Sequence, residues 1–127
     1  MPTELRLLAY ATILTWLMIL TASMLRAGGD IKIAFGNREA LPAPTPMAGR
    51  AERAARNMLE NLLLFVAVTV VSLGAHGHHD RIELGARMFF WARLAYFPCY
   101  VAGITYVRTA LWAVAVAGMG LMLSAAL

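Results

Sequence analysis

The run LLAYATILTWLMILTASML at residues 7–25 contains no charged side chain, and TALWAVAVAGMGLMLSAAL at residues 109–127 is a second run of this kind. A helix needs about 20 apolar residues to cross the roughly 30 Å hydrocarbon core of a bilayer, so each run is long enough to cross alone. Two further stretches, 61–75 and 94–107, are too short to cross unless ionisable neighbours enter the span. The sequence therefore predicts four membrane-spanning helices, two of which hold charge.

The composition of the whole chain is typical of a membrane protein. Its 127 residues are 61% hydrophobic and 14% charged, with a mean hydropathy of +0.67. A soluble domain has about 25% charged residues, so this chain carries more apolar surface than one small core can bury. The single cysteine, Cys99, excludes an internal disulfide and any multi-cysteine metal site. We expect one all-α membrane domain over residues 1–127, stabilised by helix packing within lipid.

The predicted architecture is a four-transmembrane-helix bundle with one long connection. Between residues 27 and 49 the chain contains the pair Gly28-Gly29, the step Gly36-Asn37 and three prolines, which favour turns and extended chain over helix. The other two connections are short. The four helices are expected at about residues 5–25, 51–75, 82–106 and 108–127, with the long loop at 27–49.

Basic residues near the span ends predict the orientation. Six of them lie in or beside the first loop, whereas the second loop has only Arg81, with Arg87 just inside the next helix. The positive-inside rule then places the first loop in the cytoplasm and both termini on the opposite side of the membrane. The chain would be an integral, multi-pass protein, of the inner or plasma membrane if bacterial. The basic residues of the first loop are Arg26, Lys32, Arg38, Arg50, Arg53 and Arg56.

Nucleic acid is not an expected partner, although the formal net charge is +4 and the pI is near 9.8. Binding to nucleic acid needs a solvated basic face, and most arginines here interrupt or flank apolar segments. A metal site is not expected either. The histidines between residues 76 and 80 could bind a metal, but a solvated turn is the simpler interpretation of that segment.

Polar residues in the two charged spans fall on helical stripes. Arg53, Asn57 and Glu60 have the spacing of residues that share one helix face. An ionised side chain that faces lipid at mid-helix costs at least about 2.5 kcal/mol, so the stripes should face the bundle interior or a wet cavity. We expect a polar pocket that opens to the cytoplasm. The stripe on the other charged span consists of Arg93, Tyr96 and Tyr100.

The expected pocket has more positive than negative charge. In a purely structural interpretation, Glu60 neutralises Arg93 across two helices, and Glu52 forms an ordinary helical pair with Arg56. However, one buried carboxylate cannot satisfy four arginines, and this excess favours a small polyanionic ligand with an amino group that Glu60 could bind. The four arginines are Arg53, Arg56, Arg93 and Arg108.

The segments RAARNMLEN at residues 53–61 and RLAYFPCY at residues 93–100 resemble the second-helix and third-helix signatures of a known family. This family is the membrane-associated proteins in eicosanoid and glutathione metabolism, abbreviated MAPEG. The resemblance covers essentially the whole chain and suggests a bacterial-type member. It implies a homotrimer of four-helix subunits that binds glutathione near the cytoplasmic side, between neighbouring subunits.

The resemblance also implies an activity and residue roles. Glutathione would be the co-substrate of a transferase or peroxidase that acts on lipophilic electrophiles or lipid hydroperoxides dissolved in the membrane. Arg108, early in the fourth helix, would be the catalytic residue that holds the glutathione sulfur as a thiolate, because a nearby guanidinium lowers the pKa of a thiol. The implied glutathione-binding residues are Arg26, Arg53, Arg56, Asn57, Glu60, Arg93, Tyr96 and Tyr100.

Two other functions stay open at this point. A non-catalytic member of the same family could hold a lipid or glutathione and serve a partner. A small multidrug transporter would have a similar size, but it needs a membrane-buried carboxylate in the first helix, where Glu4 stands only at the end.

Overall fold

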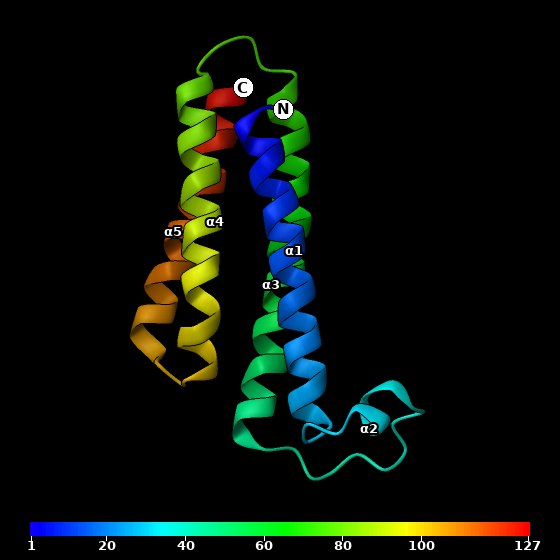
Figure 1. Ribbon diagram of the computed structural model, residues 1–127. Helices are drawn as coiled ribbons and strands as arrows, with labels where there is room; N and C mark the ends of the chain where they lie inside the picture. The colour runs from blue at the N-terminus through cyan, green and yellow to red at the C-terminus, as the bar shows by residue number, and fades with distance from the viewer.

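The computed structural model describes residues 1–127 as helices and connections, without strands. Four long helices run side by side, and a very short one lies in the first connection (Figure 1). Both termini lie at the same end of the bundle as the α3–α4 connection (Figure 1). The helices are α1 Thr3–Arg26, α2 Ile31–Phe35, α3 Pro46–Leu73, α4 His79–Val101 and α5 Thr105–Ala126.

Three of the long helices, α1, α3 and α5, are long and apolar enough to cross a membrane. The apolar sequence of α4 is interrupted by Arg87 and Arg93, which lower its hydropathy. Many large apolar side chains of the long helices are exposed on the outside of the bundle, Trp16 and Leu63 among them. Such a surface is stable in contact with lipid and unstable in water, so the chain is an integral membrane protein.

The helix α3 begins earlier than the sequence pattern predicted. It starts at Pro46 and not near residue 51. The side-chain oxygen of Thr45 accepts a hydrogen bond from the Ala48 amide at 3.1 Å, which satisfies one of the free donors at the helix start. Proline suits the first helical turn because its missing N–H has no partner to lose there. The last proline of the presumed loop therefore belongs to the helix.

The turn between α4 and α5 also differs from the predicted boundaries. The helix expected at 82–106 ends at Val101, and the last helix begins at Thr105 and not at residue 108. Gly103 has a φ of +81°, a left-handed conformation that glycine adopts without steric cost, and it reverses the chain here. The turn thus lies a few residues earlier than expected and places Arg108 within the first turns of α5.

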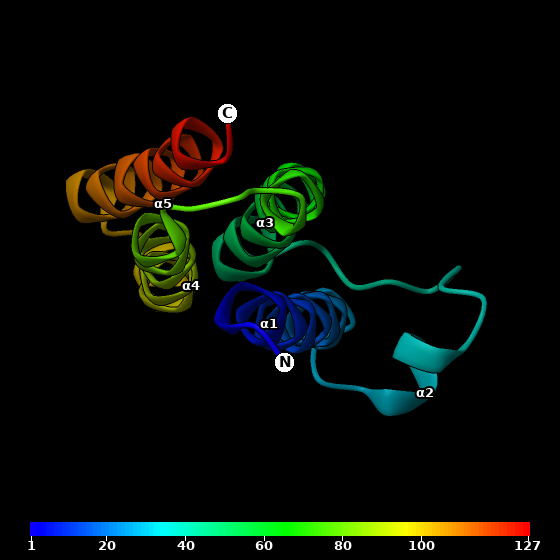
Figure 2. The ribbon, with the colours of Figure 1, turned by 90° about the horizontal axis from the view of Figure 1, so that it is seen from above.

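The long first connection contains α2, where the sequence analysis expected only turns and extended chain. The side chain of Asp30 caps α2 by accepting a hydrogen bond from the Lys32 amide at 2.9 Å. No residue of α2 is buried, and the helix lies to the side of the four long helices, in contact only with α1 (Figure 2). A local cap therefore forms this helix, and five residues are too few to produce a recognisable apolar period.

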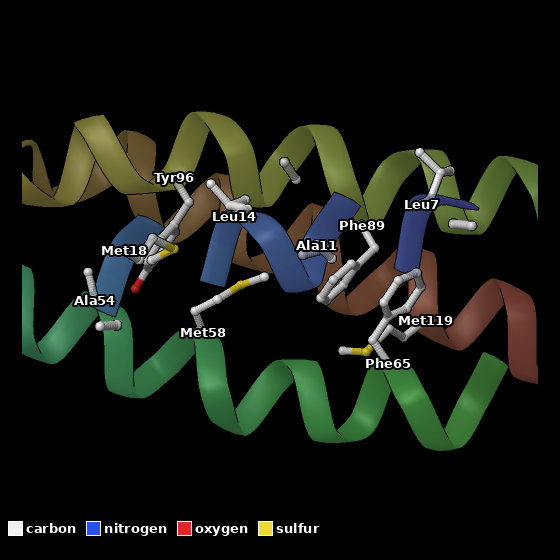
Figure 3. Packing of buried hydrophobic residues seen from close by; sticks show 14 of the residues in the cluster. Leu7, Ala11, Leu14, Met18, Ala54, Met58, Phe65, Phe89, Tyr96 and Met119 are labelled. Atoms are coloured by element: carbon white, nitrogen blue, oxygen red, sulfur yellow. The ribbon is translucent and has the colours of Figure 1, made fainter. Parts of the chain in front are cut away.

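Apolar side chains from all four long helices form the core along the length of the bundle (Figure 3). The rings of Phe65 and Phe89 stack with their centroids 4.1 Å apart and join α3 to α4. Nearer the start of α3, the side chain of Met58 is fully buried, and Tyr96 of α4 lies in the same part of the bundle (Figure 3). The core therefore continues from the apolar middle of the bundle to the polar residues at the end where α3 begins.

Glycines allow α4 and α5 to approach closely. A Cβ atom added to Gly85 would lie 2.4 Å from the carbonyl oxygen of Gly118, and one added to Gly118 would lie 2.5 Å from the carbonyl oxygen of Gly85. Small residues that bring helix backbones together are a common source of van der Waals stabilisation within membranes. The position of α5 against α4 therefore depends on these two glycines.

Candidate functional site

The polar stripes converge at the end of the bundle where α3 begins, α4 ends and α5 begins. A cavity of about 180 Å³ lies there and is bounded by all three helices. Asn57 of α3, Tyr96 of α4 and Arg108 of α5 lie in its wall, so three residues singled out from the sequence share one cavity. Thr109 and Trp112 of α5 complete the lining.

Two neighbouring tyrosine rings beside this cavity each have an arginine over one face. The guanidinium carbon of Arg93 lies 4.1 Å from the ring centroid of Tyr96, and that of Arg108 lies 4.4 Å from the ring centroid of Tyr100. The two tyrosine rings are themselves 5.5 Å apart. A cation over an aromatic face gains about 0.5 to 2 kcal/mol, depending on how far it is desolvated. The tyrosines therefore hold two positive charges in place at the cavity.

A third arginine, Arg53 of α3, contacts Tyr100. The Nε of Arg53 donates a hydrogen bond to the Tyr100 hydroxyl oxygen at 3.3 Å. The neighbouring Arg50 donates from its Nε to the backbone oxygen of Val101 at 2.8 Å, which satisfies one of the free carbonyls at the α4 end. These two contacts attach the start of α3 to the end of α4 and so determine the depth at which the stripes meet.

Arg93 is fully buried without a carboxylate partner. Its Nε donates to the sulfur of Met58 at 3.3 Å, and its two terminal nitrogens have no hydrogen-bond partner within the chain. Glu60 is exposed on α3 and forms no ion pair with Arg93. The interpretation in which Glu60 neutralises Arg93 across two helices is therefore wrong. Because an unpaired buried charge costs several kcal/mol, Arg93 is poised to interact with an anion or a polar ligand group.

Replacement of Arg93 by methionine is expected to raise the stability of the ligand-free protein by about 1 kcal/mol, because a buried guanidinium without a carboxylate partner is exchanged for an apolar side chain. Thermal unfolding in detergent, followed by circular dichroism, measures the change. The matched control is Arg87→Met on the same helix, because Arg87 is exposed and paired with Glu83. A large loss of stability in Arg93→Met would mean that the guanidinium holds the helices together by itself.

The remaining predicted residues, Arg26, Arg56 and Glu60, lie outside this cavity. Arg56 lines a second hollow of about 320 Å³ between α1 and α3, together with Glu52. The expected helical pair of Glu52 with Arg56 is absent, and Glu52 instead lies 4.0 Å from the Nε of Arg26. The guanidinium of Arg26 also donates to the backbone oxygen of Pro42. Arg56 and Glu60 are left exposed and without an ion pair on α3.

Sequence reasoning did not identify Thr109 and Trp112 as cavity residues. Trp112 follows Arg108 by four residues and therefore lies on the same face of α5, so helical spacing from Arg108 was the available signal. The structure contains no group of three or more histidine, cysteine or acidic side chains placed to hold a metal ion. Cys99 is a half-buried free thiol that does not line the cavity.

The match to a known family extends over nearly the whole chain. The family model described as the MAPEG family matches residues 6–127. A comparison with curated proteins gave no match. The matched range includes all five helices except the first residues of α1, and it contains every residue of the cavity. The resemblance drawn from residues 53–61 and 93–100 is confirmed, and the chain belongs to the MAPEG family.

Proposed function

We propose that this protein is a glutathione-dependent transferase or peroxidase that acts on lipophilic electrophiles or lipid hydroperoxides in the membrane. The MAPEG match supports a membrane function related to glutathione. The observation that carries the proposal is the cavity bounded by Asn57, Tyr96 and Arg108, with Arg53 and Arg93 beside it. No carboxylate lines this cavity, so its charge is complementary to an anionic ligand.

The residues at the cavity match the chemistry of the tripeptide. Glutathione carries two carboxylates, an ammonium group, two amides and a thiol. Guanidinium groups such as those of Arg53 and Arg93 bind carboxylates with two parallel hydrogen bonds, and the terminal nitrogens of Arg93 have donors to spare. The amide of Asn57 can both donate to and accept from a peptide group. Glu60 would accept a hydrogen bond from the ammonium group.

Arg108 is the residue that we propose for thiol activation. A free thiol has a pKa of about 8.5 and is mostly protonated at neutral pH, and an adjacent guanidinium lowers this pKa. Arg108 lies at the fourth residue of α5, where the helix N-terminus adds a partial positive charge. A thiolate held there would attack an electrophilic carbon of a substrate that arrives through the bilayer, forming a C–S bond as the leaving group departs with its electron pair. With a hydroperoxide it would attack the terminal oxygen and break the O–O bond, which yields the lipid alcohol and a glutathione sulfenic acid that a second glutathione converts to the disulfide and water.

The proposed assembly is a homotrimer of four-span subunits, with α4 as the fourth span and the first loop in the cytoplasm. The cavity of about 180 Å³ is smaller than the roughly 300 Å³ of small ligand pockets, so a tripeptide would extend beyond the single chain. Arg56 and Glu60 are exposed on a helix that is apolar enough to span a membrane, and contact with lipid there is costly. A neighbouring subunit that covers this face of α3 would complete the site.

Isothermal titration of glutathione into the purified protein tests the proposal. Arg53→Ala and Glu60→Ala are expected to weaken binding by about tenfold or more, because each removes a charged hydrogen-bond partner of the ligand. The control Arg87→Ala, at the other end of α4, should bind as the wild type does. Absence of binding in wild-type trimers would refute the proposal. Binding without turnover of an aryl halide or an organic hydroperoxide would instead indicate the non-catalytic alternative.

A further inference from the structure

The short helix α2 has side chains that the bundle does not cover. None of its residues is buried, and Ile31 and Phe35 are 62% and 80% exposed. These two side chains are four residues apart, so they lie on the same face of the helix. Figures 1 and 2 show α2 to the side of the long helices. This apolar pair therefore faces an environment other than the protein core.

Contacts of the first connection hold α2 level with the end of α1. The Arg38 guanidinium donates to the backbone oxygen of Ser23 at 3.4 Å, and Arg26 donates to that of Pro42. Ser23 and Arg26 belong to the last turn of α1, which is a candidate membrane span. The end of a span marks the edge of the hydrocarbon region, so these contacts keep α2 at the depth of the lipid headgroups.

Basic side chains lie next to the apolar pair. Lys32, Asn37 and Arg38 line a hollow of about 260 Å³ in the α2 segment, and Glu39 is the one acidic residue in its wall. Lys32 follows Ile31 directly, and a long basic side chain beside an apolar one can reach a headgroup while its stem stays in the apolar layer. Lysine and arginine are also the residues that bind phosphate oxygens. The hollow therefore fits the phosphate of an anionic lipid.

We propose that α2 is an interfacial anchor for an anionic membrane leaflet. Ile31 and Phe35 enter the boundary between headgroups and acyl chains, and Lys32 and Arg38 bind headgroup phosphates, in the manner of amphipathic segments that lie in the membrane plane. The anchor fastens the first connection to the bilayer beside the end of α1. It depends on the lipid and not on glutathione, so failure of one proposal leaves the other standing.

Spin-label accessibility tests where α2 lies. A nitroxide is attached at Ile31→Cys or Phe35→Cys in a Cys99→Ser background, in bilayers of phosphatidylcholine and phosphatidylglycerol. Both labels are expected to collide more with oxygen, which concentrates in lipid, than with a water-soluble nickel chelate. Ala43→Cys in the exposed loop provides the aqueous reference, and the fully buried Ala51→Cys provides the protein-packed reference. Labels that behave like either reference, in water or packed against protein such as a second subunit, would overturn the proposal.

The preference of the protein for anionic over zwitterionic lipid tests the role of Lys32 and Arg38 in the anchor. Spin-labelled phosphatidylglycerol should associate with the wild type more strongly than spin-labelled phosphatidylcholine does. This preference is expected to fall about fivefold for each of Lys32→Gln and Arg38→Gln, since each basic residue near an anionic surface contributes on that scale. Arg81→Gln, an exposed arginine at the other end of the bundle, is the matched control. An unchanged preference in the double variant would show that Lys32 and Arg38 do not bind headgroups.

Discussion

Arg108→Ala is expected to lower kcat/KM for thiol addition by about a hundredfold to a thousandfold, the range seen when a group that stabilises a reacting anion is removed. The affinity for glutathione should change much less, because Arg53 and Arg93 remain to bind its carboxylates. The reason for the large effect is that Arg108 is the only guanidinium in the wall of the cavity itself. Steady-state kinetics and the ultraviolet difference absorbance of the bound thiolate measure the two quantities separately.

Two variants distinguish the charge of Arg108 from its placement. Arg108→Lys keeps a positive charge without the planar group that stacks on Tyr100, so partial thiolate absorbance should remain. Tyr100→Phe keeps the ring and loses the hydrogen bond from Arg53, so its thiolate absorbance should stay close to that of the wild type. Full thiolate absorbance in Arg108→Ala would show that another group stabilises the thiolate and would remove Arg108 from the proposed role.

Gly118→Ala is expected to destabilise the bundle by about 1 to 3 kcal/mol or more, because the added methyl group overpacks a backbone contact. Its Cβ would lie 2.5 Å from the Gly85 carbonyl oxygen and 3.0 Å from the Phe89 backbone nitrogen. Neither backbone atom can move away without displacing α4. Since α4 and α5 both line the cavity, ligand binding should fall together with the melting temperature in detergent.

Gly120→Ala is the matched control for this contact. Gly120 lies on the same helix, and a Cβ added there would meet no atom within 4 Å. Alanine is favoured over glycine in a helix by up to about 1 kcal/mol, so this variant should be as stable as the wild type or slightly more stable. Equal melting temperatures for Gly118→Ala and Gly120→Ala would contradict the close approach of α4 and α5.

Local features of the sequence predicted the helices well and their ends less well. The uncharged run at 7–25 lies within α1, and the run at 109–127 covers the C-terminal part of α5. The boundary errors came from single residues whose effect depends on backbone geometry, namely the Thr45 cap and the left-handed Gly103. Helix α2 was missed because one capping side chain was enough to form it.

Spacing placed Asn57 and Tyr96 on two polar stripes, and the resemblance to the MAPEG family added Arg108; all three line the same cavity. Spacing could not show that Arg93 lies against the sulfur of Met58 and away from Glu60. A periodic pattern defines a stripe on a helix, but the rotation of that helix against its neighbours depends on the packing of many side chains.

By itself, the sequence determined that the chain is a helical membrane protein of the MAPEG family, because apolar length and motif spacing are local properties of the chain. The tertiary structure decided which polar groups share a cavity and which stay on the outer face of α3. The physical reason is that the approach of Gly85 to Gly118 and the attachment of Arg50 to Val101 determine the distance and depth of the helices. Both contacts join residues that are far apart in the sequence, so no local sequence pattern predicts them.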